Sequence, residues 1–108
     1  MVKSGATALY VTAGDPPALK CVSVLESMGL EIPRDLSVIG WDDLGLPSKS
    51  GLQLTSIGYD KIGMGREAVQ MLLQLMPRNA TACSCGLVVP TRVVEHDTTA
   101  AVTPASSA

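Results

Sequence analysis

The first two β-rich segments of the chain are each followed by acidic residues. Asp15 follows the first segment, and Asp42 and Asp43 follow the second. Ligands of open parallel sheets bind beyond the carboxyl ends of the strands, where these carboxylates would lie. An ionised carboxylate accepts stronger hydrogen bonds than a neutral oxygen does, so the three residues could bind hydroxyl groups. Trp41 could place a flat apolar ring beside them. The pattern predicts a site for a small polar ligand.

Two other roles are open for these carboxylates. Asp15 could simply cap the helix that follows it, and Asp42 and Asp43 could simply open a turn. Paired acidic residues after a strand can also hold Mg²⁺ for phosphoryl transfer. Such a phosphoacceptor domain would need a lysine after a later strand, whereas the nearest candidate, Lys61, falls in the first turn of a predicted helix. The magnesium-dependent role is therefore the least favoured.

The other reactive side chains form no catalytic or metal-binding pattern. One residue separates Cys83 from Cys85, whereas zinc sites commonly have about two to four residues between a pair of cysteines. Cys21 and His96 could join these thiols only through the fold. His96 also has no recognisable nucleophile as a partner. We therefore expect loop thiols without a metal, no cofactor and no enzyme activity.

Glycine, proline and capping residues divide the chain into strands and helices. Asp15-Pro16 predicts a helix start, and Gly29 predicts its end. Asp60 is expected to cap a second helix that Pro77 ends. The expected elements, in order, are strand 6–13, helix 16–29, strand 36–41, loop 44–53, strand 54–57, the second helix, and a β-rich segment 87–94 that Pro90 interrupts.

This order predicts an α/β layered fold with a parallel sheet. A parallel sheet needs helices on both of its faces, and two helices cover little more than one. We therefore expect the chain to be part of a larger domain or to rely on a partner. Residues 100–108 are rich in Ala, Thr and Ser and are expected to form a flexible tail.

The composition narrows the classes of function. The chain has 108 residues, of which 46% are hydrophobic and 17% charged, and a net charge of -2. Its pI of about 5.1 argues against a nucleic-acid surface or a membrane anchor built from bulk positive charge. No apolar run reaches the roughly 18 residues of a transmembrane helix, and residues 1–5 do not begin a signal peptide. Three cysteines without a secretion signal favour a cytoplasmic location.

One stretch closely resembles a known family. Residues 29–43 read Gly-Leu-Glu-Ile-Pro-Arg-Asp-Leu-Ser-Val-Ile-Gly-Trp-Asp-Asp. This is similar to the motif G-L-x-V-P-x-D-[VIL]-S-V-[IV]-G-[FYW]-D-D of the LacI/GalR family of sugar-responsive transcription repressors. Three further segments agree with the family in the same order. They are Gly14-Asp15-Pro16-Pro17-Ala18-Leu19, similar to N-D-x-x-A-[LM], Leu54-Thr55-Ser56-Ile57, similar to L-T-T-[IV], and Gly65-Arg66-Glu67-Ala68, similar to G-x-x-A.

The resemblance implies a fold like that of periplasmic sugar-binding proteins, which have two α/β subdomains. Residues 1–99 would form the C-terminal part of the effector-binding domain. Within it, residues 1–53 and 87–99 would belong to the C-terminal subdomain, and residues 54–86 to the N-terminal subdomain. The DNA-binding helix-turn-helix of the family has no counterpart in the 108 residues.

The resemblance also implies ligand-binding residues. Asp42 matches the acidic position that binds sugar hydroxyls in many members, and Trp41 matches the aromatic position before it. Gly14 and Asp15 match an Asn-Asp pair, so Gly14 removes one polar side chain from the pocket. His96 stands where the family has Arg. We expect a sugar or a related small polar metabolite as the effector.

A homodimer is a further implication of the resemblance. Its interface would use the helix 16–29 and the loop 44–53. The expected contacts are Leu19, Val22, Leu46 and Leu52. Effector binding would shift the population of dimers that bind operator DNA through a helix-turn-helix outside this chain. The alternative is a transport-type sugar-binding protein or a stand-alone sensor of the same fold, which the lack of a signal peptide disfavours.

Overall fold

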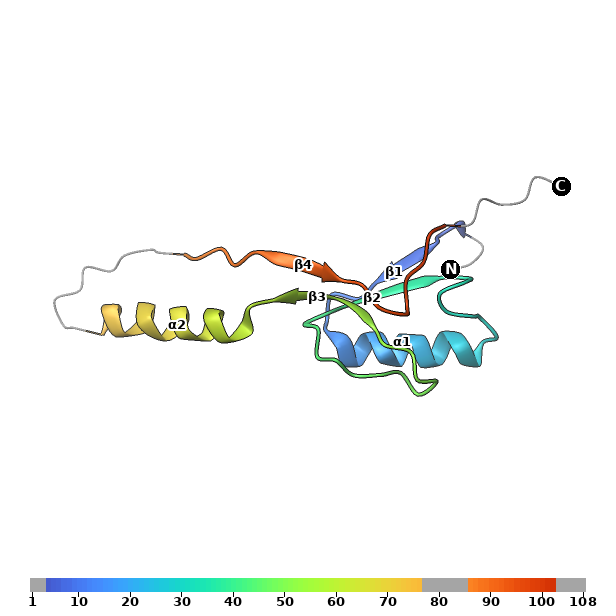
Figure 1. Ribbon diagram of the computed structural model, residues 1–108, viewed down its shortest axis with the longest axis horizontal. Coiled ribbons are helices and arrows are strands. Elements are labelled where there is room, and N and C mark those ends of the chain that lie inside the picture. The colour runs from blue at the N-terminus through green and yellow to red at the C-terminus, as the bar shows by residue number, and fades with distance from the viewer. Residues whose placement is uncertain (1–3, 77–85, 103–108) are drawn as a thin grey trace. The chain divides into compact units, whose positions relative to one another are not determined.

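A computed structural model describes residues 4–76 and 86–102 of the chain. Cys83, Cys85, Pro77 and the end of the expected tail lie outside the described residues. The elements are β1 (Ala8–Tyr10), α1 (Asp15–Ser27), β2 (Ser37–Trp41), β3 (Thr55–Tyr59), α2 (Lys61–Leu75) and β4 (Thr91–Val94), as labelled in Figure 1. They form two compact units, one of Met1–Gly58 with Arg92–Ala108 and one of Tyr59–Thr91.

The strands form one sheet in the order β1-β2-β3-β4. β1 pairs in parallel with β2, and β2 pairs in parallel with β3, where Gly40 lies opposite Ser56. Figure 1 shows β4 running in the opposite direction to β3. The predicted α/β fold with a parallel sheet is confirmed for β1, β2 and β3, whereas β4 adds an antiparallel strand at the edge. β1 is shorter than the segment 6–13 because the chain leaves the sheet after Val11, whose N–H bonds to Ile39 O at 2.8 Å.

Helix α1 ends as the sequence predicts but begins differently. Gly29 adopts a φ of 85°, its N–H bonds to Glu26 O at 3.0 Å, and Leu30 N bonds to Leu25 O at 3.1 Å. These two bonds are the usual closure of a helix by a left-handed glycine. At the start, Gly14 occupies the cap position without a side-chain bond, and Asp15 is already helical. The interpretation of Asp15 as the helix cap is therefore wrong.

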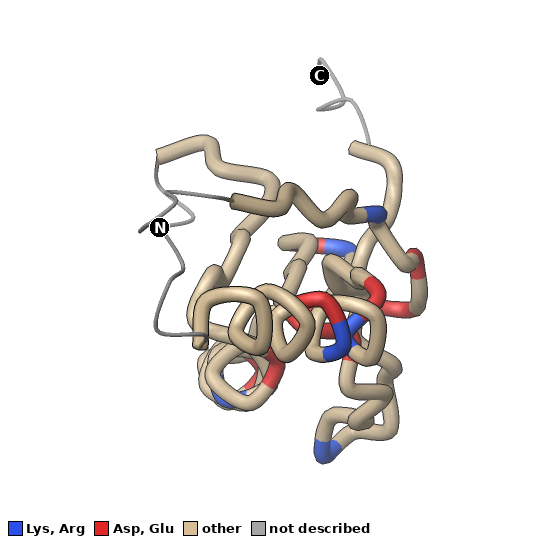
Figure 2. Tube along the Cα trace, turned by 90° about the vertical axis from the view of Figure 1, so that its left-hand side faces the viewer, with Lys and Arg blue, Asp and Glu red and all other residues tan. Residues whose placement is uncertain are grey.

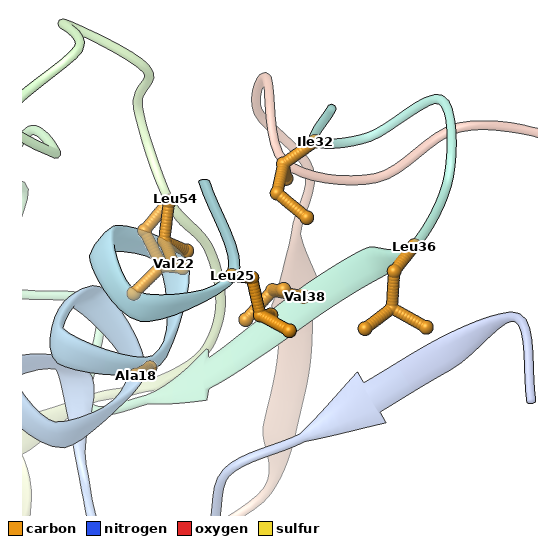
Figure 3. Close-up of a cluster of buried hydrophobic side chains, with 7 residues drawn as sticks. All are labelled: Ala18, Val22, Leu25, Ile32, Leu36, Val38 and Leu54. Atoms are coloured by element: carbon orange, nitrogen blue, oxygen red, sulfur yellow. The ribbon is translucent and has the colours of Figure 1, made fainter. Parts of the chain in front are cut away.

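One face of α1 packs against β2 and forms the core of its unit (Figure 3). Ala18, Val22 and Leu25 recur at spacings of four and three, so their side chains share one helix face. They are buried against Val38 of β2. The complete cluster comprises Ala18, Val22, Leu25, Ile32, Leu36, Val38 and Leu54.

The segment after β4 is tied to this sheet by buried hydrogen bonds. Thr98 is fully buried, and its Oγ1 donates to Val38 O at 2.7 Å and accepts from Thr55 N at 2.9 Å. Val38 N donates in turn to Thr98 O at 2.8 Å. Asp97 Oδ2 accepts from Gln53 N at 2.8 Å. The residues around Thr98 therefore join β2 to the start of β3.

The loop between α1 and β2 is closed by Asp35. Its Oδ2 accepts from Glu31 N at 2.7 Å, and its own N–H donates to Glu31 O at 2.7 Å. The backbone N–H of Glu31 and the side chain of Arg34 lower the pKa of the Asp35 carboxyl below its ordinary value of 3.8. The resulting compact turn leads into β2.

Helix α2 belongs to the second unit and begins at the predicted cap. Asp60 Oδ1 accepts from Gly63 N at 2.9 Å. None of its described residues is buried, and Ile62, Leu72 and Leu73 are 78%, 58% and 58% exposed. An apolar helix face of this size normally packs against protein. Within the described ranges, no helix is both long and apolar enough to cross a membrane.

Candidate functional site

The carboxyl ends of β1 and β2 bring together three of the four proposed ligand-binding residues. Gly14 lies beyond β1, and Trp41 and Asp42 lie at the end of β2. A Cβ placed on Gly14 would be 3.5 Å from Asp42 Oδ2 and 4.0 Å from Trp41 O. Trp41 and Asp42 are both partly buried. The carboxylate of Asp42 thus lies beside the start of α1, at the end of the sheet where open parallel sheets bind ligands.

Gly14 shapes this site through its backbone. Its φ of 115° lies in the left-handed region that side chains rarely adopt, and the residue is buried. Any side chain here would also touch the carboxylate of Asp42. The absence of the family's Asn side chain therefore lets the backbone before α1 lie directly beside Asp42.

Asp15 is buried next to the turn that follows β2. Its side chain is only 2% exposed. Its Oδ2 accepts from Leu44 N at 2.7 Å, and its Oδ1 accepts from Ser56 Oγ at 2.6 Å. A buried carboxylate is stable only when its oxygens are bonded in this way. Asp15 thus connects the start of α1 to the turn after β2 and to β3.

The turn after β2 has an unusual backbone. Asp42 and Asp43 have φ values of 98° and 51°, which are both left-handed and uncommon for residues with side chains. Asp42 N donates to Ile57 O at 3.0 Å, and Asp43 N donates to Ser56 Oγ at 3.0 Å. Together with the bond from Leu44 N to Asp15, three successive amides of the turn have acceptors.

Ser56 is the site residue that the sequence analysis missed. Its hydroxyl donates to Asp15 and accepts from Asp43, and its side chain is completely buried. The only signal was its place in the segment Leu54-Thr55-Ser56-Ile57, which predicted a strand rather than a side-chain role. The pairing of Ser56 on β3 with Gly40 on β2 explains its contact with Asp15. Gly40 has no side chain, and the space that its Cβ would fill is occupied by the Asp15 carboxylate.

The carboxylate of Asp43 lies near β3. A Cβ placed on Gly58 would be 3.3 Å from Asp43 Oδ2 and 3.0 Å from Val94 Cγ2. The two consecutive aspartates therefore have different surroundings, since Asp42 lies beside Gly14. This difference makes Asp42 the better candidate for binding a ligand at the end of β1.

The residues expected at a dimer interface do not all reach the surface. Leu46 is 43% exposed, and Leu19 and Leu52 are partly buried against the core. Val22 is 0% exposed inside that core, so its side chain is corrected from an interface contact to a core residue. It points inward because it shares a helix face with Ala18 and Leu25.

Within 4–76 and 86–102, no cluster of three or more His, Cys, Asp or Glu could hold a metal ion. His96 is exposed, and its backbone N–H donates to Thr55 Oγ1 at 2.8 Å.

Lys61 Nζ lies 4.9 Å from the ring centroid of Tyr59. Figure 2 shows the Lys and Arg positions scattered along the described trace.

Comparisons with known proteins agree on one family. The model of the periplasmic binding protein-like domain matches residues 2–99. The chain is 31% identical over 71 residues to the arabinose metabolism transcriptional repressor of Geobacillus stearothermophilus, covering 66% of this chain and 20% of that protein. It is 40% identical over 68 residues to the transcriptional repressor PurR of Haemophilus influenzae, and this match covers 63% of this chain and 20% of PurR. These relatives are repressors, not enzymes.

Solved structures show the same relationship. The lac repressor dimer bound to operator and the anti-inducer ONPF matches with a TM-score of 0.74 and 33% identity, over 94% of this chain and 35% of that chain. The present chain therefore spans about a fifth of the length of its curated relatives and about a third of this structure. The chain belongs to the periplasmic binding protein-like domain family, and it is similar to a part of LacI-type repressors.

Proposed function

We propose that the chain forms one wall of a small-molecule effector site and that Asp42 is its main ligand contact. The observation that carries this proposal is the position of the Asp42 carboxylate beside Gly14 at the carboxyl end of the sheet, directly after Trp41. The carboxylate would accept hydrogen bonds from ligand hydroxyl groups. Trp41 would offer its ring to an apolar ligand face, as binding pockets commonly combine a few polar groups with aromatic walls.

Asp15, the remaining ligand residue expected from the sequence, has a different role in this proposal. Both of its oxygens accept hydrogen bonds from the protein, and its side chain is buried. It would therefore hold the turn that carries Asp42 in place, through Leu44 and Ser56, rather than touch the effector. Gly14 would place backbone next to the effector instead of a side-chain amide.

The proposed effector class is a sugar or a related small polar metabolite. The similar repressor of Geobacillus stearothermophilus is named for arabinose metabolism, and the similar lac repressor was solved with the anti-inducer ONPF. Charge-assisted acceptance by Asp42 fits a ligand with several hydroxyl donors. The identity of the sugar would depend on the rest of the domain.

The two compact units would correspond to the two subdomains of the family fold. The unit boundaries fall between Gly58 and Tyr59 and between Thr91 and Arg92. They lie a few residues from the boundaries expected at 53–54 and 86–87. This nearness supports the proposed assignment of the chain's outer segments to the C-terminal subdomain and its middle segment to the N-terminal one.

The proposed regulator acts as a cytoplasmic homodimer. Leu46, which is exposed, and the partly buried Leu19 and Leu52 would contribute contacts to the dimer. Effector binding would change the population of dimers that bind operator DNA, because a ligand shifts a conformational equilibrium by its differential affinity for the two states. The DNA would be bound by a helix-turn-helix outside these 108 residues.

The experiment that tests the regulator assignment is to read the genomic DNA upstream of the Met1 codon. We expect an uninterrupted frame of roughly 220–240 codons that begins with a helix-turn-helix module, from the usual sizes of such domains. A frame that opens with a secretion signal would instead support the transport-protein alternative. A stop codon directly upstream would contradict DNA control by this polypeptide.

A further inference from the structure

The turn that carries Asp42 needs support from other parts of the unit. Both of its aspartates have left-handed backbones, with φ values of 98° at Asp42 and 51° at Asp43. Residues with a Cβ resist this region, and such conformations persist only where the surroundings fix them. The direction of the Asp42 side chain depends on this backbone. A relaxed turn would therefore move its carboxylate away from Gly14.

The support comes from two buried side chains on different elements. Ser56 on β3 is 0% exposed, and Asp15 at the start of α1 is 2% exposed. The Ser56 hydroxyl donates its only proton to Asp15 Oδ1 at 2.6 Å, which leaves its oxygen to accept from Asp43 N at 3.0 Å. The second oxygen of Asp15 accepts from Leu44 N at 2.7 Å. Two adjacent amides of the turn thus depend on one buried pair.

We propose that Ser56 is a positioning residue for the Asp42 ligand contact and that it acts through its paired hydrogen bonds to Asp15 and Asp43. This inference rests on the proposed role of Asp42 in binding the effector. The donor role of the hydroxyl strengthens its acceptor role, since linked hydrogen bonds polarise one another. Loss of the hydroxyl would leave both Asp15 Oδ1 and Asp43 N without their partners.

The test measures amide hydrogen exchange by NMR in the 108-residue chain. In Ser56→Ala we expect exchange at the Asp43 and Leu44 amides to rise about tenfold or more relative to the Val38 amide, because their acceptors are lost or loosened. Acrylamide quenching of Trp41, the sole tryptophan, should rise as well. Ser56→Thr keeps the hydroxyl and should restore both readouts.

Ser37→Ala is the matched control. It removes another buried serine hydroxyl, whose partner is Ala100, from the opposite end of β2. It should leave the exchange at Asp43 and the quenching of Trp41 unchanged. Unchanged exchange at Asp43 and Leu44 in folded Ser56→Ala would overturn the proposal.

A second variant keeps the test decisive if Ser56→Ala does not fold. Ser56→Cys keeps the approximate size of the side chain and replaces the hydroxyl with a thiol, which is a weaker donor and acceptor toward Asp15 and Asp43. We expect faster exchange at residues 43 and 44 than in the wild type, and unchanged exchange would count against the proposal. The ligand contact is tested separately. A loosened turn in Ser56→Ala, together with equal affinity of the wild type and Asp42→Asn for L-arabinose or another sugar that the wild type binds, would refute the proposed function of Asp42 but leave the support of the turn intact.

Discussion

Among single residues, a glycine is as important to the site as its carboxylates. Gly40 is buried in β2 opposite Ser56, and Asp15 occupies the space that a side chain at Gly40 would fill. A Cβ there would overlap Asp15 Oδ1 and lie 2.7 Å from Leu54 Cδ2. The buried Asp15–Ser56 pair therefore exists because the neighbouring strand has no side chain at this position.

Gly40→Ala should destabilise the unit strongly. The added methyl group has no space, and overpacking of this kind costs about 1–3 kcal/mol, with displacement of Asp15 adding to it. Chemical denaturation followed by Trp41 fluorescence measures the loss. Gly65→Ala on α2 is the control, since its Cβ would meet nothing within 4 Å. The control should leave stability unchanged or raise it by about 0.5–1 kcal/mol. Equal stability of the two variants would contradict the packing argument.

The Asp35 turn gives a prediction about pH. The Glu31 N–H and Arg34 hold the pKa of the Asp35 carboxyl below 3.8, so the folded state binds this proton less readily than the unfolded state. Its stabilising contribution is present above about pH 4 and is lost as the pH falls through the folded pKa. An NMR titration of the carboxyl should give a pKa below 3.8, and Asp35→Asn should abolish this part of the acid dependence. A pKa at or above 3.8 would refute the prediction.

The sequence could predict some site residues but not their connections. Asp42 and Gly14 stand directly after β-rich segments, so the rule for parallel sheets places them together. Ser56 was missed because its partner Asp15 lies 41 residues away in the chain. Such a contact depends on the register of β2 with β3, which local sequence patterns do not specify. The inward direction of Val22 was misjudged for a similar reason, because it follows from which helix face meets the sheet.

At the scale of elements, the sheet depends on residues that follow its last strand. Thr98 joins β2 to β3 through its hydroxyl and its carbonyl. The helices were predictable because their caps and apolar spacings are local, as Gly29 and Asp60 illustrate. The extent of β1 was overestimated because strand length depends on pairing with β2 rather than on composition alone.

Thr98→Val should weaken this junction. Valine has nearly the same shape but leaves Thr55 N and Val38 O without their side-chain partner, which costs about 1–3 kcal/mol for buried groups. Thermal unfolding of the variant measures the loss. Thr91→Val, an exposed position in β4, is the matched control and should change stability by less than about 0.5 kcal/mol. A similar small change in Thr98→Val would show that the buried bonds contribute little.

For the whole molecule, the described chain leaves much apolar surface uncovered. α2 has no buried residue, and Val24 of α1 and Met28, directly after this helix, are 48% and 71% exposed. The chain also spans about a fifth of the length of its curated relatives. The sequence predicted this need for further packing from its small number of helices. Effector binding should therefore be measured in the longest polypeptide that the genomic frame through Met1 encodes.

The most direct test of the account is calorimetric titration of that polypeptide with a panel of sugars that includes L-arabinose and sucrose. We compare the wild type with Asp42→Asn, since Asn tolerates a left-handed backbone and removes only the charge. Glu95→Gln, at an exposed carboxylate, is the control. We predict that one sugar binds and that Asp42→Asn weakens it at least about tenfold, as expected for a lost charge-assisted bond. A sugar that binds equally well to Asp42→Asn, or no binding by any sugar, would contradict the account.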